Sequence, residues 1–255
     1  MDKKLALLVM SATLMLWSPP THADPVGCPA PAEPQGIAPT DPPNLGLLKY
    51  KLRVYRCTRY DAQLAAVAAE AKAWIDQQAG RVTRPALVLD IDETSLSNWD
   101  EIFQNDYGYI PGGACDLGGK GACGAHDWEV SARAPAIKPT LDLFNFAKAR
   151  NVAVFFVTGR YDDAPEGVGS DVDGVEKAAT KLNLRVAGYA GWDGLTLRNP
   201  RSPGASVAEY KRDARIAIEK LGYQIIANVG DQESDLALEH ADRTFKYPNP
   251  FYVIP

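Results

Sequence analysis

The chain has 255 residues, of which 23% are charged, and its net charge at neutral pH is −5. This acidic balance argues against general binding of a nucleic-acid polymer or of an anionic membrane surface, because both need a basic face. The length is enough for one α/β domain that carries an inserted segment.

Residues 1–23 have the pattern of a secretory signal peptide. Two lysines precede the apolar run 5–17, and residues 21–23 resemble a small-residue cleavage site, so we expect cleavage after Ala23. The apolar run is short for a transmembrane helix, although a retained N-terminal anchor is the alternative. We therefore expect a periplasmic or secreted protein with no stable membrane anchor after cleavage. The sequence leaves the oligomeric state open, a homo-oligomer included.

The four cysteines predict disulfides. An even number of cysteines in an exported protein is typical of paired thiols, and four cysteines allow three pairings. Closeness in the sequence favours Cys28–Cys57 and Cys115–Cys123. A zinc site is disfavoured because the chain has no Cys-x-x-Cys.

The first half of the chain predicts a proline-rich lead-in, a helix, a strand and an insertion. Residues 24–44 are expected to form an extended lead-in to a domain at 45–255. Apolar side chains at helical spacing predict a helix over 61–79, with Asp61 as its cap. The buried strand 86–91 follows. Residues about 96–138 show no clear period, and we expect them to form an inserted cap.

The second half alternates helices and strands. The expected order is a helix at 139–150, a strand at 152–157, a helix at 175–183, a third strand within 185–197, a helix at 206–221, a strand at 223–229, a short helix and a final strand near 243–247. Such alternation predicts an α/β fold with a mostly parallel sheet and right-handed crossovers.

Polar side chains follow the ends of the expected strands. Asp90 and Asp92 follow the first strand, Thr158 and Arg160 the second, and Asp231 and Asp235 the strand at 223–229. Parallel strands would bring these side chains together at one edge of the sheet. Lys211, on the helix 206–221, could reach the same edge. Taken alone, the first pair could instead be solvated loop aspartates, or Asp92 or Thr94 could cap a helix.

These residue types indicate phosphoryl chemistry. Carboxylates at this density need a cation, and hard oxygen ligands suit Mg²⁺. A small, highly charged anion such as a phosphoryl group would complete the charge balance. Its oxygens would be held by Thr158 and by exposed amides, and Lys211 would neutralise charge.

At this point the chain resembles the haloacid dehalogenase (HAD) superfamily of phosphatases. The motifs Asp-Ile-Asp-Glu-Thr (90–94), Val-Thr-Gly-Arg (157–160), a single lysine and Gly-Asp-x-x-x-Asp (230–235) occur in that order. More narrowly, it is similar to the class B, subfamily IIIB acid phosphatases, related to bacterial lipoprotein acid phosphatases and plant vegetative storage proteins. Leu96-Ser97-Asn98, Tyr210-Lys211 and residues 246–250 carry the narrower likeness. The resemblance implies a Rossmann-like HAD fold.

The resemblance also implies roles for the site residues. Asp90 would be the nucleophile and Asp92 the proton carrier. Mg²⁺ would be held by Asp90, the Asp92 carbonyl and Asp231, with Asp235 ligating directly or through water. The expected phosphate-binding residues are Thr158, Gly159, Lys211 and Arg160. Other roles remain open for three of these side chains: Asp235 could cap a helix, Arg160 could anchor a carboxylate, and Lys211 could be solvated.

The expected function is hydrolysis of small phosphomonoesters, nucleoside monophosphates among them. Trp99, Trp128 and Tyr107 of the cap would either stack on the substrate or belong to the core. Phosphotransfer to an alcohol is an alternative reaction, and a non-catalytic storage or binding protein with the same fold is an alternative of another class.

Overall fold

A parallel β-sheet forms the centre of the protein. The computed structural model describes residues 27, 28, 32, 34–36, 42–165, 172–201 and 205–254. Within these residues the sheet has five strands in the order β3-β2-β1-β4-β5, and every neighbouring pair is parallel. The strands are β1 Pro85–Leu89, β2 Ala153–Tyr161, β3 Gly194–Arg198, β4 Gln224–Gly230 and β5 Thr244–Lys246. The expected α/β fold is confirmed.

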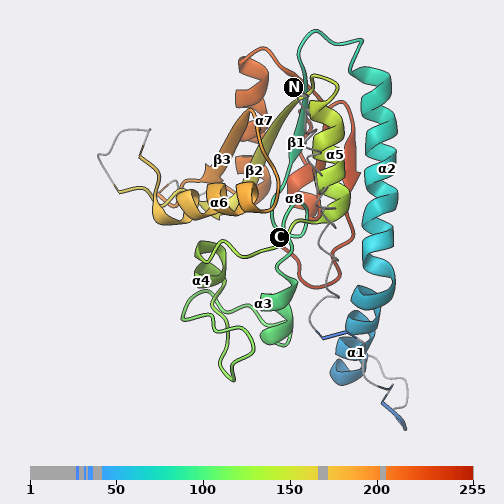
Figure 1. The fold of residues 1–255 in the computed structure, drawn as a ribbon, viewed down its shortest axis with the longest axis vertical. Coiled ribbons are helices and arrows are strands. Elements are labelled where there is room, and N and C mark those ends of the chain that lie inside the picture. The colour runs from blue at the N-terminus through green and yellow to red at the C-terminus, as the bar shows by residue number, and fades with distance from the viewer. Residues whose placement is uncertain are drawn as a thin grey trace, which may run out of the picture.

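Helices cover both faces of the sheet. The helices are α1 Leu45–Tyr55, α2 Asp61–Gln78, α3 Trp99–Gln104, α4 Ala125–Val130, α5 Lys138–Lys148, α6 Val175–Val186, α7 Val207–Lys220 and α8 Glu233–Leu236. Figure 1 shows α2 and α5 side by side along one face, with α3 and α4 beyond one end of the sheet.

Side chains of the central strand, β1, pack against the helices on both faces of the sheet. Leu87 and Leu89 of β1 pack in the cluster that includes α2 and α5, whereas Val88 packs with Ala214 and Ile218 of α7. Neighbouring residues of a strand point to opposite faces, so β1 is apolar throughout and buried along its whole length.

The expected helix at 61–79 is confirmed as α2, but its expected cap, Asp61, is wrong. Helix α1 and a π-helical turn at Arg56–Tyr60 lead into α2, and Asp61 itself has helical backbone angles. Instead of capping the helix, the Asp61 carboxylate accepts a hydrogen bond from Arg56 Nη1 at 2.9 Å. The cap of the whole segment is Asn44, whose side chain accepts from the Leu47 amide at 3.1 Å.

Two expected strand boundaries also move. Strand β2 continues four residues past Val157 to Tyr161, where it pairs with Arg198 of β3, so Thr158 and Arg160 lie on a strand. The third strand is confined to 194–198. Helix α6 extends to Val186 because its last turns bury Leu184.

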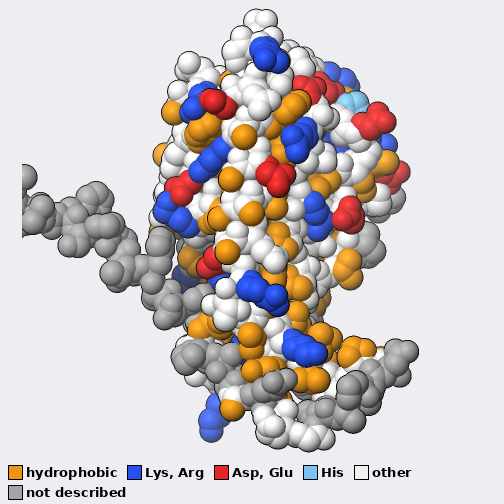
Figure 2. Space-filling view, turned by 90° about the vertical axis from the view of Figure 1, so that its right-hand side faces the viewer, with side chains coloured by type: hydrophobic (Ala, Val, Ile, Leu, Met, Phe, Trp, Pro, Cys, Tyr) orange, Lys and Arg blue, Asp and Glu red, His pale blue; other side chains and the backbone are white. Residues whose placement is uncertain are grey.

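The surface on the α2 side mixes both signs of charge. Figure 2 shows basic and acidic side chains interspersed over this face, with apolar side chains gathered near its lower end, where α1 lies. Among the described residues, the helices are all too short or too polar to cross a membrane. The expected signal peptide, residues 1–23, lies outside the described residues.

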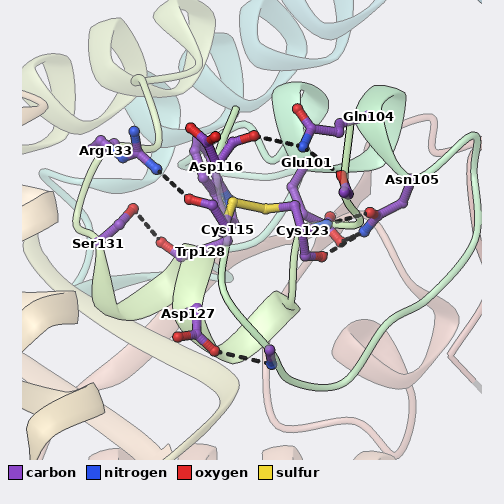
Figure 3. Close-up of a disulfide and its surroundings, with 12 residues drawn as sticks. Glu101, Gln104, Asn105, Cys115, Asp116, Cys123, Asp127, Trp128, Ser131 and Arg133 are labelled. Carbon is purple, nitrogen blue, oxygen red and sulfur yellow. Dashed lines mark hydrogen bonds between the residues drawn. A yellow bond between two sulfur atoms is a disulfide. The ribbon is translucent and has the colours of Figure 1, made fainter. Parts of the chain in front are cut away.

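The segment between β1 and α5 carries α3, α4 and a disulfide loop. The expected pairs Cys28–Cys57 and Cys115–Cys123 are confirmed. Beside the second disulfide, the Asn105 side chain donates to the Cys123 carbonyl at 2.7 Å and accepts from its amide at 2.8 Å (Figure 3). The same Asn105 amide donates to Glu101 at 2.6 Å, which links the loop to α3.

The two disulfides should stabilise the protein unequally. They close loops of sequence separation 29 and 8, and the entropy removed from the unfolded chain grows with loop length. Replacing Cys28 and Cys57 by serine should lower the free energy of unfolding by about 3–4 kcal/mol, and replacing Cys115 and Cys123 by about 2–3 kcal/mol. Equilibrium unfolding in urea measures both, and the reverse order would contradict this account.

Candidate active site

The ends of three strands meet in one cavity. Asp90 follows β1, Arg160 lies near the end of β2, and Asp231 follows β4. With Asp92 and Lys211 they line a cavity of about 540 Å³, which α3 and α4 border from the other side. This edge of a parallel sheet is where open α/β folds bind ligands.

A buried ammonium group lies among buried carboxylates. Lys211 Nζ is 2.6 Å from Asp90 Oδ1 and also contacts Asp235. All three residues are buried. Glycine at position 230 lets Asp235 lie close to the end of β4, because a Cβ added at Gly230 would lie 2.4 Å from the Cβ of Asp235. Helix α7 is fixed at its start by a capping box between Ser206 and Glu209, and it carries Lys211 to the site.

The negative charge of this cluster exceeds its positive charge. Burial and the Asp235 carboxylate raise the pKa of Asp90 above its usual range, although Lys211 opposes this. Burial and Asp235 likewise raise the pKa of Asp231 to about 6. Burial lowers the pKa of Lys211, but the Asp90 and Asp235 carboxylates more than offset this and hold it above its ordinary value. One ammonium group therefore faces three carboxyl groups.

This cluster suits a hard divalent cation. Ligand oxygens of Asp90, Asp231 and Asp235 lie within 4.8 Å of one another, and all three residues are buried. Carboxylate oxygens are the ligands that Mg²⁺ prefers, and a dication would balance the excess negative charge. The residues predicted to bind the metal through their side chains are therefore brought together, and they fit that group.

Arg160 is engaged by Asp92. Arg160 Nη2 lies 2.6 Å from Asp92 Oδ1, and its Nε lies 3.1 and 3.2 Å from the two Asp92 oxygens. Burial raises the pKa of Asp92, but the Arg160 guanidinium and its hydrogen bonds lower it below its ordinary value. Thr158 Oγ1 is 3.4 Å from Asp92 Oδ2 and is fully buried. Gly159, between them, lines the cavity.

The sequence interpretation missed Asn98 as a site residue. Its side-chain amide donates to Asp92 Oδ1 at 2.9 Å, and its carbonyl oxygen accepts from Trp128 Nε1 at 2.8 Å. Its backbone amide donates to Glu93 Oε1 at 2.7 Å. In the sequence, Leu-Ser-Asn after the first motif indicates only the family likeness. Asn98 therefore connects α4 of the insertion to Asp92.

The three aromatic residues predicted to stack on the substrate differ in their position relative to the cavity. Trp128 and Tyr107 line the cavity, whereas Trp99 is outside its lining. Trp99 is buried and stacks on Phe103 with ring centroids 5.5 Å apart, which makes it part of the core.

The family of the chain follows from a comparison of its whole length. A family model described as HAD superfamily, subfamily IIIB (acid phosphatase), matches residues 30–255. The chain belongs to this family. All the site residues described above lie within the residues that the subfamily IIIB model matches.

Relatives of known name agree with this membership. The chain is 32% identical over 174 residues to the stem 28 kDa glycoprotein of Glycine max, covering 67% of this chain and 61% of that protein. It is 30% identical over 172 residues to acid phosphatase 1 of Solanum lycopersicum, covering 67% of this chain and 60% of that one. The matches therefore span less than two thirds of the length of these relatives.

A solved structure shares the fold. The class C acid phosphatase from Bacillus anthracis with tungstate bound superposes with a TM-score of 0.59 at 18% identity. The match covers 81% of this chain and 85% of that one. At this identity the likeness establishes a common fold and nothing about substrates.

Glu101 should make stability depend on pH. Burial raises its pKa to about 7, against about 4.3 in an unfolded chain, although the hydrogen bond from Asn105 opposes this. Between these values the unfolded state binds fewer protons than the folded state, so stability falls as the pH rises. Glutamine keeps an acceptor for Asn105 but does not ionise. Glu101→Gln should therefore raise the melting temperature by about 2–6 °C at pH 8 and leave it unchanged at pH 4.

Melting curves at both pH values test this, with Glu70→Gln on the exposed side of α2 as the control for a lost surface charge. A Glu101→Gln variant with the same shift at pH 4 and pH 8 would contradict the assignment.

Proposed function

We propose that this protein is an exported, Mg²⁺-dependent phosphomonoesterase that forms an aspartyl-phosphate on Asp90. The observation that carries the proposal is the position of Asp90 in the cavity, held by Lys211 at 2.6 Å, together with the presence of Asp92 in the same cavity. Membership of an acid phosphatase family and the likeness to a tomato acid phosphatase support it. The disulfides and the glycoprotein relative support export.

In the first step, an oxygen of Asp90 attacks phosphorus and the bond from phosphorus to the ester oxygen breaks. Lys211 offsets negative charge on the phosphoryl oxygens, with Thr158 and the backbone at Gly159 as further phosphate ligands. The leaving oxygen takes a proton from Asp92, which must be protonated for this step although Arg160 favours its ionised form. Arg160 and Asn98 orient its carboxyl group.

In the second step, water attacks the phosphorus of the aspartyl-phosphate. Asp92 removes a proton from this water, the bond between Asp90 and phosphorus breaks, and inorganic phosphate leaves. The Asp90 carboxylate is regenerated. A Mg²⁺ ion held by the carboxylates of Asp90 and Asp231, the Asp92 carbonyl and Asp235 would reduce the repulsion between nucleophile and phosphate.

We assign Arg160 mainly to positioning. Its three hydrogen bonds to Asp92 and a fourth, from Nη1 to Thr180 Oγ1 at 3.3 Å, use most of its donors. This geometry supports the alternative that Arg160 anchors a carboxylate. The complete set of carboxylates supports catalysis over a storage function.

Asp90→Asn should abolish turnover of p-nitrophenyl phosphate. Asparagine keeps the shape of the side chain but is a poor nucleophile, so kcat should fall at least about 1,000-fold. Asp142→Asn, on α5 and paired with Lys138, is the matched control and should behave as wild type. Phosphate release, measured with Mg²⁺ and with a chelator, should stop in the chelator and return when Mg²⁺ is restored. Equal activity of the two variants would contradict the proposal.

A further inference from the structure

Three glutamates from separate helices line the cavity. Glu101 lies on α3, Glu129 on α4 and Glu176 in the first turn of α6. We call them the acidic wall. Glu101 and Glu176 are buried, and Glu129 is partly buried. The active-site mechanism proposed above uses none of them.

The basic side chains of the cavity are outnumbered by its carboxyl groups. Among the described residues that line the cavity, the basic ones are Lys211, Arg160, Arg198 and His126, against seven aspartates and glutamates. Lys211 contacts Asp90 and Asp235, and Arg160 contacts Asp92. The Arg198 guanidinium donates to the Ala205 carbonyl at 2.9 Å. Glu176 is paired with His126, whose Nδ1 lies 3.2 Å from Oε2, but the cavity as a whole contains more carboxyl groups than basic side chains.

Two carboxyl groups of the acidic wall, those of Glu101 and Glu129, have raised pKa values. Burial and the neighbouring Asp92 and Glu176 carboxylates raise the pKa of Glu129 to about 9, although Arg160 opposes this. An ammonium group that enters the space between such carboxyl groups would be attracted electrostatically and would favour their ionised form.

Aromatic side chains border the same space. Tyr107, Tyr109, Trp128 and Tyr252 line the cavity. Tyr109 is 78% exposed, and its hydroxyl lies near enough to all three glutamates that their charges add to burial in raising its pKa. Aromatic rings combined with carboxylates are typical of sites that bind ammonium groups.

We propose that the acidic wall binds a cationic leaving group, so that the preferred substrates are phosphomonoesters of amino alcohols. This rests on the proposed function, because the wall is assigned relative to the phosphoryl site. The leaving oxygen takes its proton from Asp92, which lines the same cavity as the wall. The atoms beyond the leaving oxygen can therefore extend within this cavity to the wall. An ammonium group two carbons from the ester oxygen would enter it.

An organic cation suits the wall better than a metal ion. His126, Glu129 and Glu176 do bring ligand atoms within 4.8 Å of one another. However, one Glu176 oxygen accepts from the Tyr161 amide at 2.6 Å, and the other lies 3.2 Å from His126 Nδ1. Both oxygens of the most buried ligand are thus already engaged, whereas an ammonium group needs only their charge.

Two esters of the same shape test this proposal. Phosphocholine and 3,3-dimethylbutyl phosphate differ by a nitrogen cation in place of a carbon atom. With Mg²⁺ present, wild-type kcat/KM should favour phosphocholine by at least about 10-fold, which corresponds to about 1.4 kcal/mol. In Glu129→Gln this ratio should fall toward one. Asp127→Asn, an exposed change of the same charge on the same helix, should keep the wild-type ratio.

The controls separate the possible failures. Circular dichroism and melting curves check that Glu129→Gln is folded, and calorimetric binding of both esters to Asp90→Asn reads the preference without turnover. A wild-type ratio of one, or the same loss in Glu129→Gln and Asp127→Asn, would overturn the proposal. So would a preference that appears only after Zn²⁺ is added and is lost in His126→Ala, since the wall would then be a metal site.

Failure of the proposed function gives a different result. In that case neither ester nor p-nitrophenyl phosphate would be hydrolysed, while calorimetry with the two esters would still decide whether the wall prefers the cation.

Discussion

The burial of several carboxylates around one ammonium group is the constraint on which the rest of the structure depends. Asp90, Asp231 and Asp235 come within 4.8 Å of one another in the interior, where isolated charges are strongly disfavoured. Lys211 compensates for part of this charge. The parallel sheet makes the cluster unavoidable, because the ends of β1 and β4 are neighbours.

Hydrogen bonds to Asp231 supply further stabilisation. Asp231 accepts from Thr94 at 2.8 Å, from Gln232 at 2.6 Å and from Asn249 at 2.8 Å. The Asp231 carbonyl also accepts from Lys246 at 2.5 Å. The first motif, the last strand and the C-terminal segment are therefore all tied to Asp231. The site is a folding constraint as well as a place for chemistry.

The insertion completes the site through hydrogen bonds to Asp92. Asn98 accepts a hydrogen bond from the Trp128 indole and donates one from its side-chain amide to Asp92. The placement of α4 and the orientation of the proposed proton carrier are therefore coupled. The same helix contributes Glu129 to the acidic wall. Under the two proposals above, a single short helix bears on both proton transfer and the choice of leaving group.

The sequence was sufficient to predict the parallel sheet and the site residues at its edge. Apolar strands followed by aspartates identified Asp90 and Asp231, because strand ends in a parallel sheet must converge. The extension of β2 over Arg160 was not predictable, since Thr-Gly-Arg reads as a loop, and its pairing with β3 is a long-range effect. The acidic wall was also missed. Its glutamates lie on three helices, and no spacing in the chain reveals that they share a cavity.

The central claim is that Asp90 forms a covalent bond to phosphorus. Rapid acid quenching of the enzyme with ³²P-labelled phosphomonoester tests it most directly. The account predicts label on a peptide that contains Asp90, released by hydroxylamine as expected for an acyl phosphate, and no label on Asp90→Asn. Turnover without any labelled protein, or label that persists in Asp90→Asn, would contradict it.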